Sequence, residues 1–133
     1  MERHCFWRGI YYLFCNFNII IPFREGEMKK VIKELKIDKV IHERARLLIM
    51  TVVASRPDKK IGFNDLKDIS QLTSGNLSIQ LKKLEEEDYL KIVKGYKGNR
   101  PYTEIELTEK GKRALEEYLE EMEKILKIYR GEV

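Results

Sequence analysis

The segment from residue 73 to 85 limits most strongly what this chain can fold into, because it reads as one helix with a different chemistry on each face. Its apolar positions recur at spacings of four and three residues, which places them on one buried stripe: Leu77, Leu81 and Leu84. Thr73 or Ser74 offers a side-chain oxygen that caps the free N–H groups of the first turn. The pattern predicts a helix over residues 74–87 whose other face is left for another purpose.

The outer face of this helix carries small polar side chains at its beginning and lysines toward its end. The candidates for contact with DNA on this face are Ser74, Asn76, Ser78, Gln80, Lys82 and Lys83. Small residues let a helix approach closely, amides hydrogen-bond to base edges in the major groove, and lysines neutralise phosphates. Solvated surface helices that bind nothing have a similar composition, so the helix alone does not decide between the two interpretations.

Two β-favouring runs follow this helix and enclose a basic connection. Residues 89–94 and 102–107 alternate apolar with charged side chains, which predicts strands with one buried and one exposed face. The connection holds two glycines, an asparagine and a proline, so we expect a hairpin with a loose tip. Its cations are Lys94, Lys97 and Arg100, and it has no acid. A cationic tip directly after such a helix suits a phosphate backbone or a minor groove.

Two further helices are predicted before this region. Residues 38–55 read as a helix that Asp38 caps, and residues 63–69 read as a second one. Residues 60–62 are expected to form a short strand that joins the hairpin. Two arginines on the first helix reach either a DNA backbone or solvent, and we favour solvent for both: Arg44 and Arg46.

The last predicted helix runs from residue 108 to 130, with Thr108 as its cap. Apolar side chains along it step by four, three, four and three residues, as in a heptad seam: Leu115, Leu119, Met122, Leu126 and Tyr129. Because this helix extends well past the hairpin, one small domain cannot easily bury the far end of the seam. The pattern favours a partner helix from a second copy. Packing inside the chain, against residues 1–36, stays open as the alternative.

Helix, helix and then basic hairpin is the plan of a winged helix. From about Ile37 to Ile128 the chain resembles the small winged-helix transcriptional regulators of the MarR/ArsR-like group, in particular a compact archaeal-type subgroup. The segments that carry the resemblance are IHERARLLI at 41–49, FNDL at 63–66, LTSGNLS at 72–78, LKKLE at 81–85, GNRPYT at 98–103 and LTEKGKRAL at 107–115. No segment is diagnostic by itself, and their order and spacing together are what is specific.

The resemblance implies a mainly α-helical winged helix-turn-helix domain with a small β-hairpin and an extended C-terminal dimerisation helix. It implies a homodimeric, cytoplasmic regulator that binds specific double-stranded DNA, with recognition helix 74–87 in the major groove and wing 94–101 on the backbone or in the minor groove. A two-fold dimer spaces its recognition helices by about 10 base pairs, which favours a near-palindromic operator. Relatives often carry histidine where this chain has Gln80, so base preference does not transfer. The alternatives are a winged-helix adaptor that binds protein within a larger assembly and a winged helix that binds RNA.

Residues 1–27 precede the part that resembles the family, residues 28–133. Their apolar run at 9–23 is shorter than the roughly 20 residues of a membrane span and contains polar residues and a proline, so we expect no membrane partner. Translation from an upstream start codon explains this extension, and so does a genuine strand or helix that packs on the dimer. We favour the first explanation.

Composition and charge favour anion binding over catalysis in a single domain of 133 residues. The net charge is +4, and acids collect at 85–88 and 116–123 while the hairpin tip stays basic. No Ser-His-Asp order, phosphate-binding glycine loop or cluster of metal ligands occurs, so we expect no enzymatic activity, cofactor or metal site. Cys5 and Cys15 are isolated and are expected to be reduced thiols. Nothing in the sequence identifies a small-molecule effector.

Overall fold

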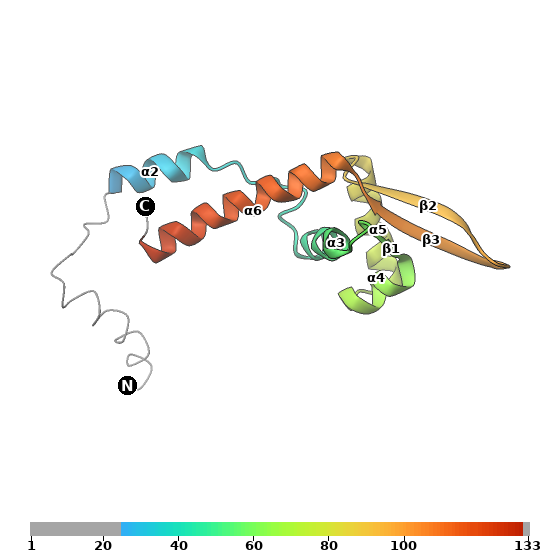
Figure 1. Cartoon of the computed structure of the whole chain (residues 1–133). Coiled ribbons are helices and arrows are strands. Elements are labelled where there is room, and N and C mark those ends of the chain that lie inside the picture. The colour runs from blue at the N-terminus through green and yellow to red at the C-terminus, as the bar shows by residue number, and fades with distance from the viewer. Residues whose placement is uncertain (1–24, 132–133) are drawn as a thin grey trace, which may run out of the picture. The chain divides into compact units, whose positions relative to one another are not determined.

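The computed structural model describes residues 25–131 (Figure 1). The larger of its two units spans Leu35–Leu126, and the smaller one includes helix α2 (Glu25–Glu34) and the described residues after Leu126. No residue of α2 is buried. The predicted extension of residues 1–27 lies almost wholly outside the described residues, so its boundary at residue 28 stays a prediction.

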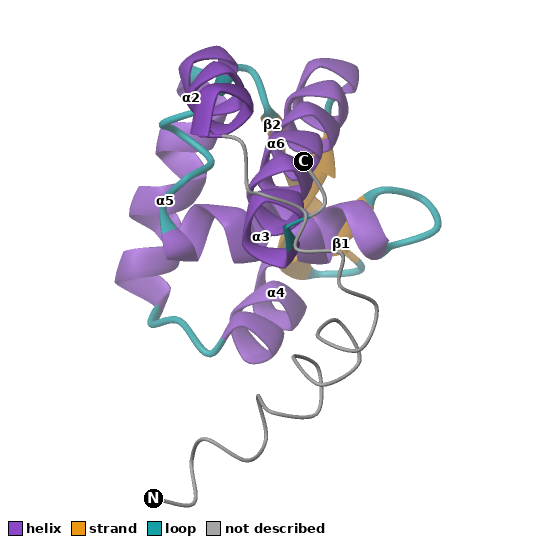
Figure 2. Ribbon diagram, turned by 90° about the vertical axis from the view of Figure 1, so that its left-hand side faces the viewer, coloured by secondary structure: helices purple, strands orange, loops and turns teal. Residues whose placement is uncertain are grey.

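The larger unit is built from helices and a small antiparallel sheet. Its elements are α3 (Arg44–Ser55), β1 (Lys60–Gly62), α4 (Phe63–Ser70), α5 (Ser74–Glu86), β2 (Leu90–Lys97), β3 (Arg100–Leu107) and α6 (Glu109–Arg130), whose last residues belong to the smaller unit. The sheet has the order β1-β3-β2, and α3 contacts both α4 and α5 (Figure 2). This is a winged helix, which confirms the predicted fold class, and the short strand at 60–62 is confirmed with it.

The core lies where α3, α4 and α5 meet the sheet. Its most completely buried side chains are Ile41, Ile49, Met50, Val53, Leu66, Leu77, Leu81, Leu84, Leu90 and Ile105. The predicted leucine stripe of α5 is therefore confirmed. Because one face of α5 is committed to the core in this way, its polar face is turned outward.

Helix α3 begins at Arg44, and the prediction that Asp38 caps it is wrong. Asp38 caps a separate turn, in which its Oδ1 accepts the N–H of Val40 at 2.7 Å. Glu43 is the N-cap of α3, and its carboxylate accepts the N–H of Arg46 at 3.1 Å. Aspartate is a preferred N-cap residue and glutamate is not, so residue type favours Asp38 although Glu43 is the cap that the structure shows.

The hairpin is more regular than the predicted loose tip, which is wrong. Strands β2 and β3 pair without interruption as far as Lys97 opposite Arg100, so that only Gly98 and Asn99 connect them. Gly98 has a φ of +65°, which suits the first central position of a two-residue turn. Pro101 is tolerated inside β3 because β1 pairs only with residues 104–106, and nearer the tip β3 has a free edge.

Four residues, Asp88, Tyr89, Thr108 and Gly111, form a joint that connects the end of α5 to β2 and α6. Asp88 has a left-handed φ of 58°, and the N–H groups of Asp88 and Tyr89 bond back to the last turn of α5 at 2.9 and 3.0 Å. Thr108 caps α6 as predicted, because its hydroxyl oxygen accepts the N–H of Gly111 at 2.9 Å. The same hydroxyl donates to the Asp88 carbonyl at 2.5 Å. The ends of three elements are thus held together by hydrogen bonds between backbone groups and from the Thr108 hydroxyl to backbone groups.

Tyr89 of this joint also holds the start of the larger unit. Its hydroxyl donates to Oδ2 of Asp38 at 2.6 Å. Burial, and after it the hydrogen bond to the Asp38 carboxylate, raise the pKa of the Tyr89 hydroxyl above its ordinary value. The hydroxyl is therefore a hydrogen-bond donor at neutral pH.

Candidate nucleic-acid interface

The outer face of α5 is exposed to solvent. Five of the six residues predicted on it are exposed: Ser74, Asn76, Ser78, Lys82 and Lys83. Thr73 caps the helix by accepting the N–H of Asn76 at 3.2 Å, so the first turn is held in helical geometry. The hydroxyl of Ser78 donates to the Ser74 carbonyl at 2.8 Å and lies along the helix surface. The face presents short polar groups first and cations in its second half.

Gln80, the sixth residue predicted on this face, is half-buried, and its side chain makes two hydrogen bonds. Its Oε1 accepts from Nη1 of Arg46 at 2.8 Å, and its amide nitrogen donates to Oδ1 of Asn76 at 3.1 Å. Arg46 is held in turn by Glu43, whose Oε2 lies 3.8 Å from Nη1, and by the carbonyl of Val40, which accepts from Nε. The prediction that Arg46 is solvated is wrong, because α3 directs it onto α5.

Sequence reasoning assigned Arg46 to solvent and did not include Ile79 among the candidate contact residues. Arg46 carried no local signal, because its partner Gln80 is 34 positions away and belongs to another helix. Ile79 is 56% exposed in the middle of the polar face of α5. A large apolar side chain surrounded by polar ones on an exposed face was a visible signal, since such a group can contact a thymine methyl.

The three predicted cations of the hairpin do not share one face of the sheet. Cross-strand partners lie on the same face, so Lys97 and Arg100 form a directly opposed pair, and Lys94 lies on the other face opposite Thr103. Like charges directly opposite each other are unfavourable. The Lys97 ammonium lies 4.8 Å from the centre of the Tyr102 ring, a cation–π contact that offsets part of this cost.

The hairpin tip keeps its positive charge. Within residues 25–131, the ion pairs of the sheet are confined to its base, where Lys60 and Glu106 approach to 3.0 Å. The hydrogen bond to Glu106 raises the pKa of Lys60, as expected for an ammonium beside a carboxylate. No acid of the described chain pairs with Lys94, Lys97 or Arg100.

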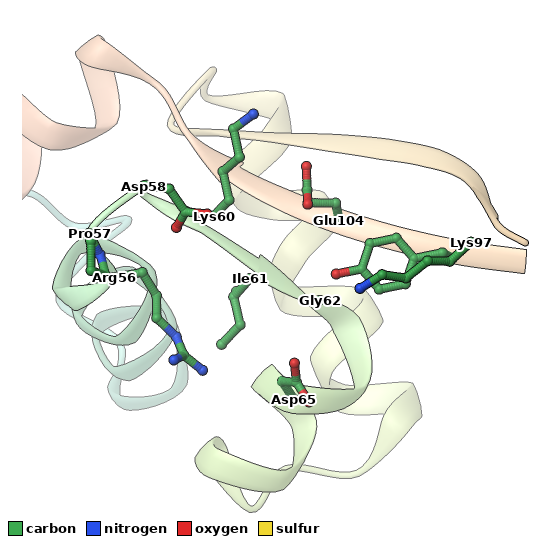
Figure 3. A pocket seen from close by; sticks show the side chains of 10 residues that line it. Arg56, Pro57, Asp58, Lys60, Ile61, Gly62, Asp65, Lys97 and Glu104 are labelled. Atoms are coloured by element: carbon green, nitrogen blue, oxygen red, sulfur yellow. The ribbon is translucent and has the colours of Figure 1, made fainter.

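The base of the hairpin is packed closely against β1. Gly62 leaves room for Tyr102, because a Cβ at Gly62 would lie 2.8 Å from the Tyr102 hydroxyl. A hollow beside this contact (Figure 3) is lined by Arg56, Pro57, Asp58, Lys60, Ile61, Gly62, Asp65, Lys97, Tyr102 and Glu104. Its three cations face three acids, so it has no net charge with which to select an anion.

The predicted seam on α6 is divided between two environments. Leu115 is 4% exposed and packs inside the core of the larger unit, and Met122 is half-buried against the same core. Leu119 and Leu126 are 48% and 47% exposed. Tyr129, which belongs to the smaller unit, is 69% exposed. The exposed members of the predicted seam are therefore Leu119, Leu126 and Tyr129.

The described residues offer neither a metal site nor a membrane segment. No group of three or more His, Cys, Asp or Glu side chains in residues 25–131 is placed to hold a metal ion. No helix in that same range combines the length and the apolar character that crossing a bilayer requires. Cys5 and Cys15 lie outside the described residues.

Comparison with known proteins identifies the family. Residues 45–126, more than half of the chain, match the winged helix DNA-binding domain family, so this protein belongs to that family. An uncharacterized protein of Methanocaldococcus jannaschii is 42% identical over 60 residues, which are 45% of this chain and 65% of that protein. The match with this curated relative thus spans just under two thirds of the relative's length.

Solved structures with the same fold include transcriptional regulators. A transcriptional regulator homologue protein from Pyrococcus horikoshii is 25% identical with a TM-score of 0.60, over 76% of this chain and 94% of that one. A MarR family transcriptional regulator from Streptomyces coelicolor, solved in complex with DNA, has a TM-score of 0.55 at 14% identity, over 77% of this chain and 69% of that one. At 14% identity the likeness shows the fold alone. The predicted resemblance to MarR-like winged-helix proteins is confirmed at this level.

Proposed function

We propose that this protein is a sequence-specific DNA-binding transcriptional regulator that acts as a homodimer in the cytoplasm. The observation that carries the proposal is the division of α5, which buries three leucines in the core and exposes a face of serines, amides and lysines. A helix of this kind fits the major groove, where amide side chains read base edges. Membership of a DNA-binding family supports the same assignment.

Each part of the interface has its own role in this proposal. The amides of Asn76 and Gln80 form the polar centre of the reading face, with Ser74 and Ser78 beside them and Ile79 placed for a thymine methyl. Lys82 and Lys83 neutralise phosphates. The hairpin cations bind the backbone or the minor groove: Lys94, Lys97 and Arg100.

Selection of bound duplexes from a random pool tests the proposal most directly. We expect one enriched motif made of two inverted half-sites about 10 base pairs apart, and binding that weakens steeply as salt is raised. An adaptor that binds protein would retain no duplex in a salt-dependent way, and that result would reject DNA binding. An enriched motif without two-fold symmetry would reject the homodimer and keep the DNA-binding role.

The homodimer has a test of its own on α6. Leu119 and Leu126 are seven positions apart and about half exposed, so they lie on one face that a second copy can cover. Changing both to glutamate buries charge in such an interface, and we expect a monomer by sedimentation equilibrium. Replacing Glu116 and Glu123, also seven apart and exposed, by glutamine is the matched control and should leave the dimer intact. A wild-type protein that sediments as a monomer at micromolar concentration would contradict the dimer outright.

A further inference from the structure

We propose that Gln80 reads no base itself but orients Asn76 as the base-reading group, and that Arg46 is the positioning residue behind both. The class of base that Asn76 then takes is a keto base, guanine or thymine. This inference rests on the proposed function, because it assumes that α5 lies in a major groove. It adds which side chain distinguishes between bases, and which bases that side chain prefers.

The hydrogen bonds can run in only one direction. A guanidinium donates and never accepts, so the Gln80 oxygen must face Arg46, at 2.8 Å from Nη1. The Gln80 amide nitrogen is then turned to Asn76, where it donates to Oδ1 at 3.1 Å. The oxygen of Asn76 is occupied on that side. Its NH₂ group donates to no residue of the described chain, and the side chain is exposed.

Arg46 is fixed firmly enough to impose this order. Its Nε donates to the Val40 carbonyl, and its Nη1 lies 3.8 Å from the carboxylate of Glu43, the N-cap of α3. Burial acts to raise the pKa of Glu43, but hydrogen bonds from the N–H groups of Ala45 and Arg46 outweigh it and lower this pKa. The anchor is therefore charged at neutral pH. Arg46 is also mostly buried, so α3 determines which group α5 presents.

The chemistry of the major groove turns this orientation into a base preference. Guanine offers acceptors at N7 and O6 and thymine at O4, whereas cytosine offers a donor at N4 and adenine a donor at N6 beside its N7 acceptor. An outward NH₂ group pairs with acceptors and opposes donors. At the position that Asn76 reads, we expect guanine or thymine to be preferred over cytosine or adenine by about tenfold or more.

Gln80→Glu separates positioning from reading. A carboxylate still accepts from Arg46 but cannot donate, so Asn76 must turn its NH₂ group inward and its oxygen outward. The preference at that one position should then invert, from keto bases to cytosine or adenine. Gln80→Met removes both hydrogen bonds and should abolish the preference without inverting it. Lys83→Gln is the matched control, since it lowers net charge by the same unit and should weaken binding to all sequences with preferences unchanged.

The experiment is selection from a random duplex pool with wild type and the three variants, after Asn76→Ala has identified the position concerned. Inversion by Gln80→Glu alone supports the inference. Three results would overturn the inference. They are an unchanged preference in Gln80→Glu, a loss of preference at a different position in Gln80→Met, and a preference of the wild type for an amino base.

A measurement on the free protein distinguishes this inference from the proposed function. In NMR spectra, Arg46→Met should shift the side-chain NH₂ signals of both Gln80 and Asn76. The backbone amide signals of residues away from this network should keep their wild-type positions, which shows that the protein remains folded. Signals that do not move show that the network is absent, and the inference fails whatever the DNA result. If the signals move but wild type enriches no sequence, the proposed function fails and the base-reading role falls with it.

Discussion

Helix α5 and the hairpin are both exposed, but they expose different kinds of group. The polar centre of α5 is fixed by contacts within the protein. Gln80 is hydrogen-bonded to Arg46 and Asn76, and the leucines of the helix pack in the core. The hairpin is braced at its base, where β1 pairs with residues 104–106 and Tyr102 lies against Gly62. Its tip carries cations that no acid of the described chain pairs with, two of them directly opposed.

This difference assigns discrimination and affinity to separate parts of the domain. A hydrogen-bonding group with a fixed direction penalises a wrong base, because a mismatch leaves a donor or an acceptor without its partner. A cation near phosphate contributes on any sequence and loses its effect as salt is raised. Substitutions in α5 should therefore act at single base positions, and substitutions at the hairpin tip should act uniformly.

A substitution in the joint that connects α5, β2 and α6 should have the largest effect of those considered, and it acts on stability. A Cβ at Gly111 would lie 2.1 Å from the carbonyl oxygen of Tyr89, which is backbone and cannot rotate away. We expect Gly111→Ala to lower the free energy of unfolding by about 3 kcal/mol, measured by urea denaturation.

Gly75→Ala is the matched control for this substitution. Gly75 lies in α5, and a Cβ there meets nothing within 4 Å. Alanine should raise stability at this position by roughly 0.5–1 kcal/mol, because it is the better helix former. Equal effects of the two substitutions would show that helix propensity matters here and the contact at the joint does not.

On α5 itself, Asn76→Ala should cost about 1–3 kcal/mol of binding to the preferred site and much less on a duplex changed at the base that Asn76 reads. Fluorescence anisotropy with a panel of single-base variants of the selected duplex measures both values. The substitution is at an exposed position, so the unfolding transition should stay within about 0.5 kcal/mol of wild type. A uniform loss across the panel would assign Asn76 to general affinity and break the comparison.

The features of this interface that the sequence predicted are those with a local cause. The leucine stripe of α5, a cap at Thr73 or Ser74 and the Thr108 cap of α6 follow from spacing and residue type within a few positions, and the structure selects Thr73. The winged-helix order could be predicted because each element carries such a signal.

The features that failed depend on contacts between distant segments. Residue type favours Asp38 as the cap of α3, but Asp38 caps a separate turn and Glu43 caps the helix. Pro101 and its neighbours signal a turn, but pairing with β2 continues past them because the outer edge of β3 is unpaired there. Arg46 was wrongly assigned to solvent, since its contact with Gln80 exists only because α3 packs against α5. Residue type identifies the polar face, and tertiary contact decides which of its groups point outward.

The smallest expected effect is at the hairpin tip. Arg100→Ala should weaken binding to preferred and unrelated duplexes by the same factor, because Arg100 is exposed and its proposed partner is phosphate. Removing one phosphate contact should reduce the slope of log affinity against log salt by about one unit. Lys112→Ala, an exposed cation on α6, is the matched control and should leave the slope unchanged. A base-specific loss in Arg100→Ala would mean that the tip reads sequence in the minor groove. An unchanged affinity and slope would remove the hairpin from the interface and leave α5 to supply both discrimination and affinity.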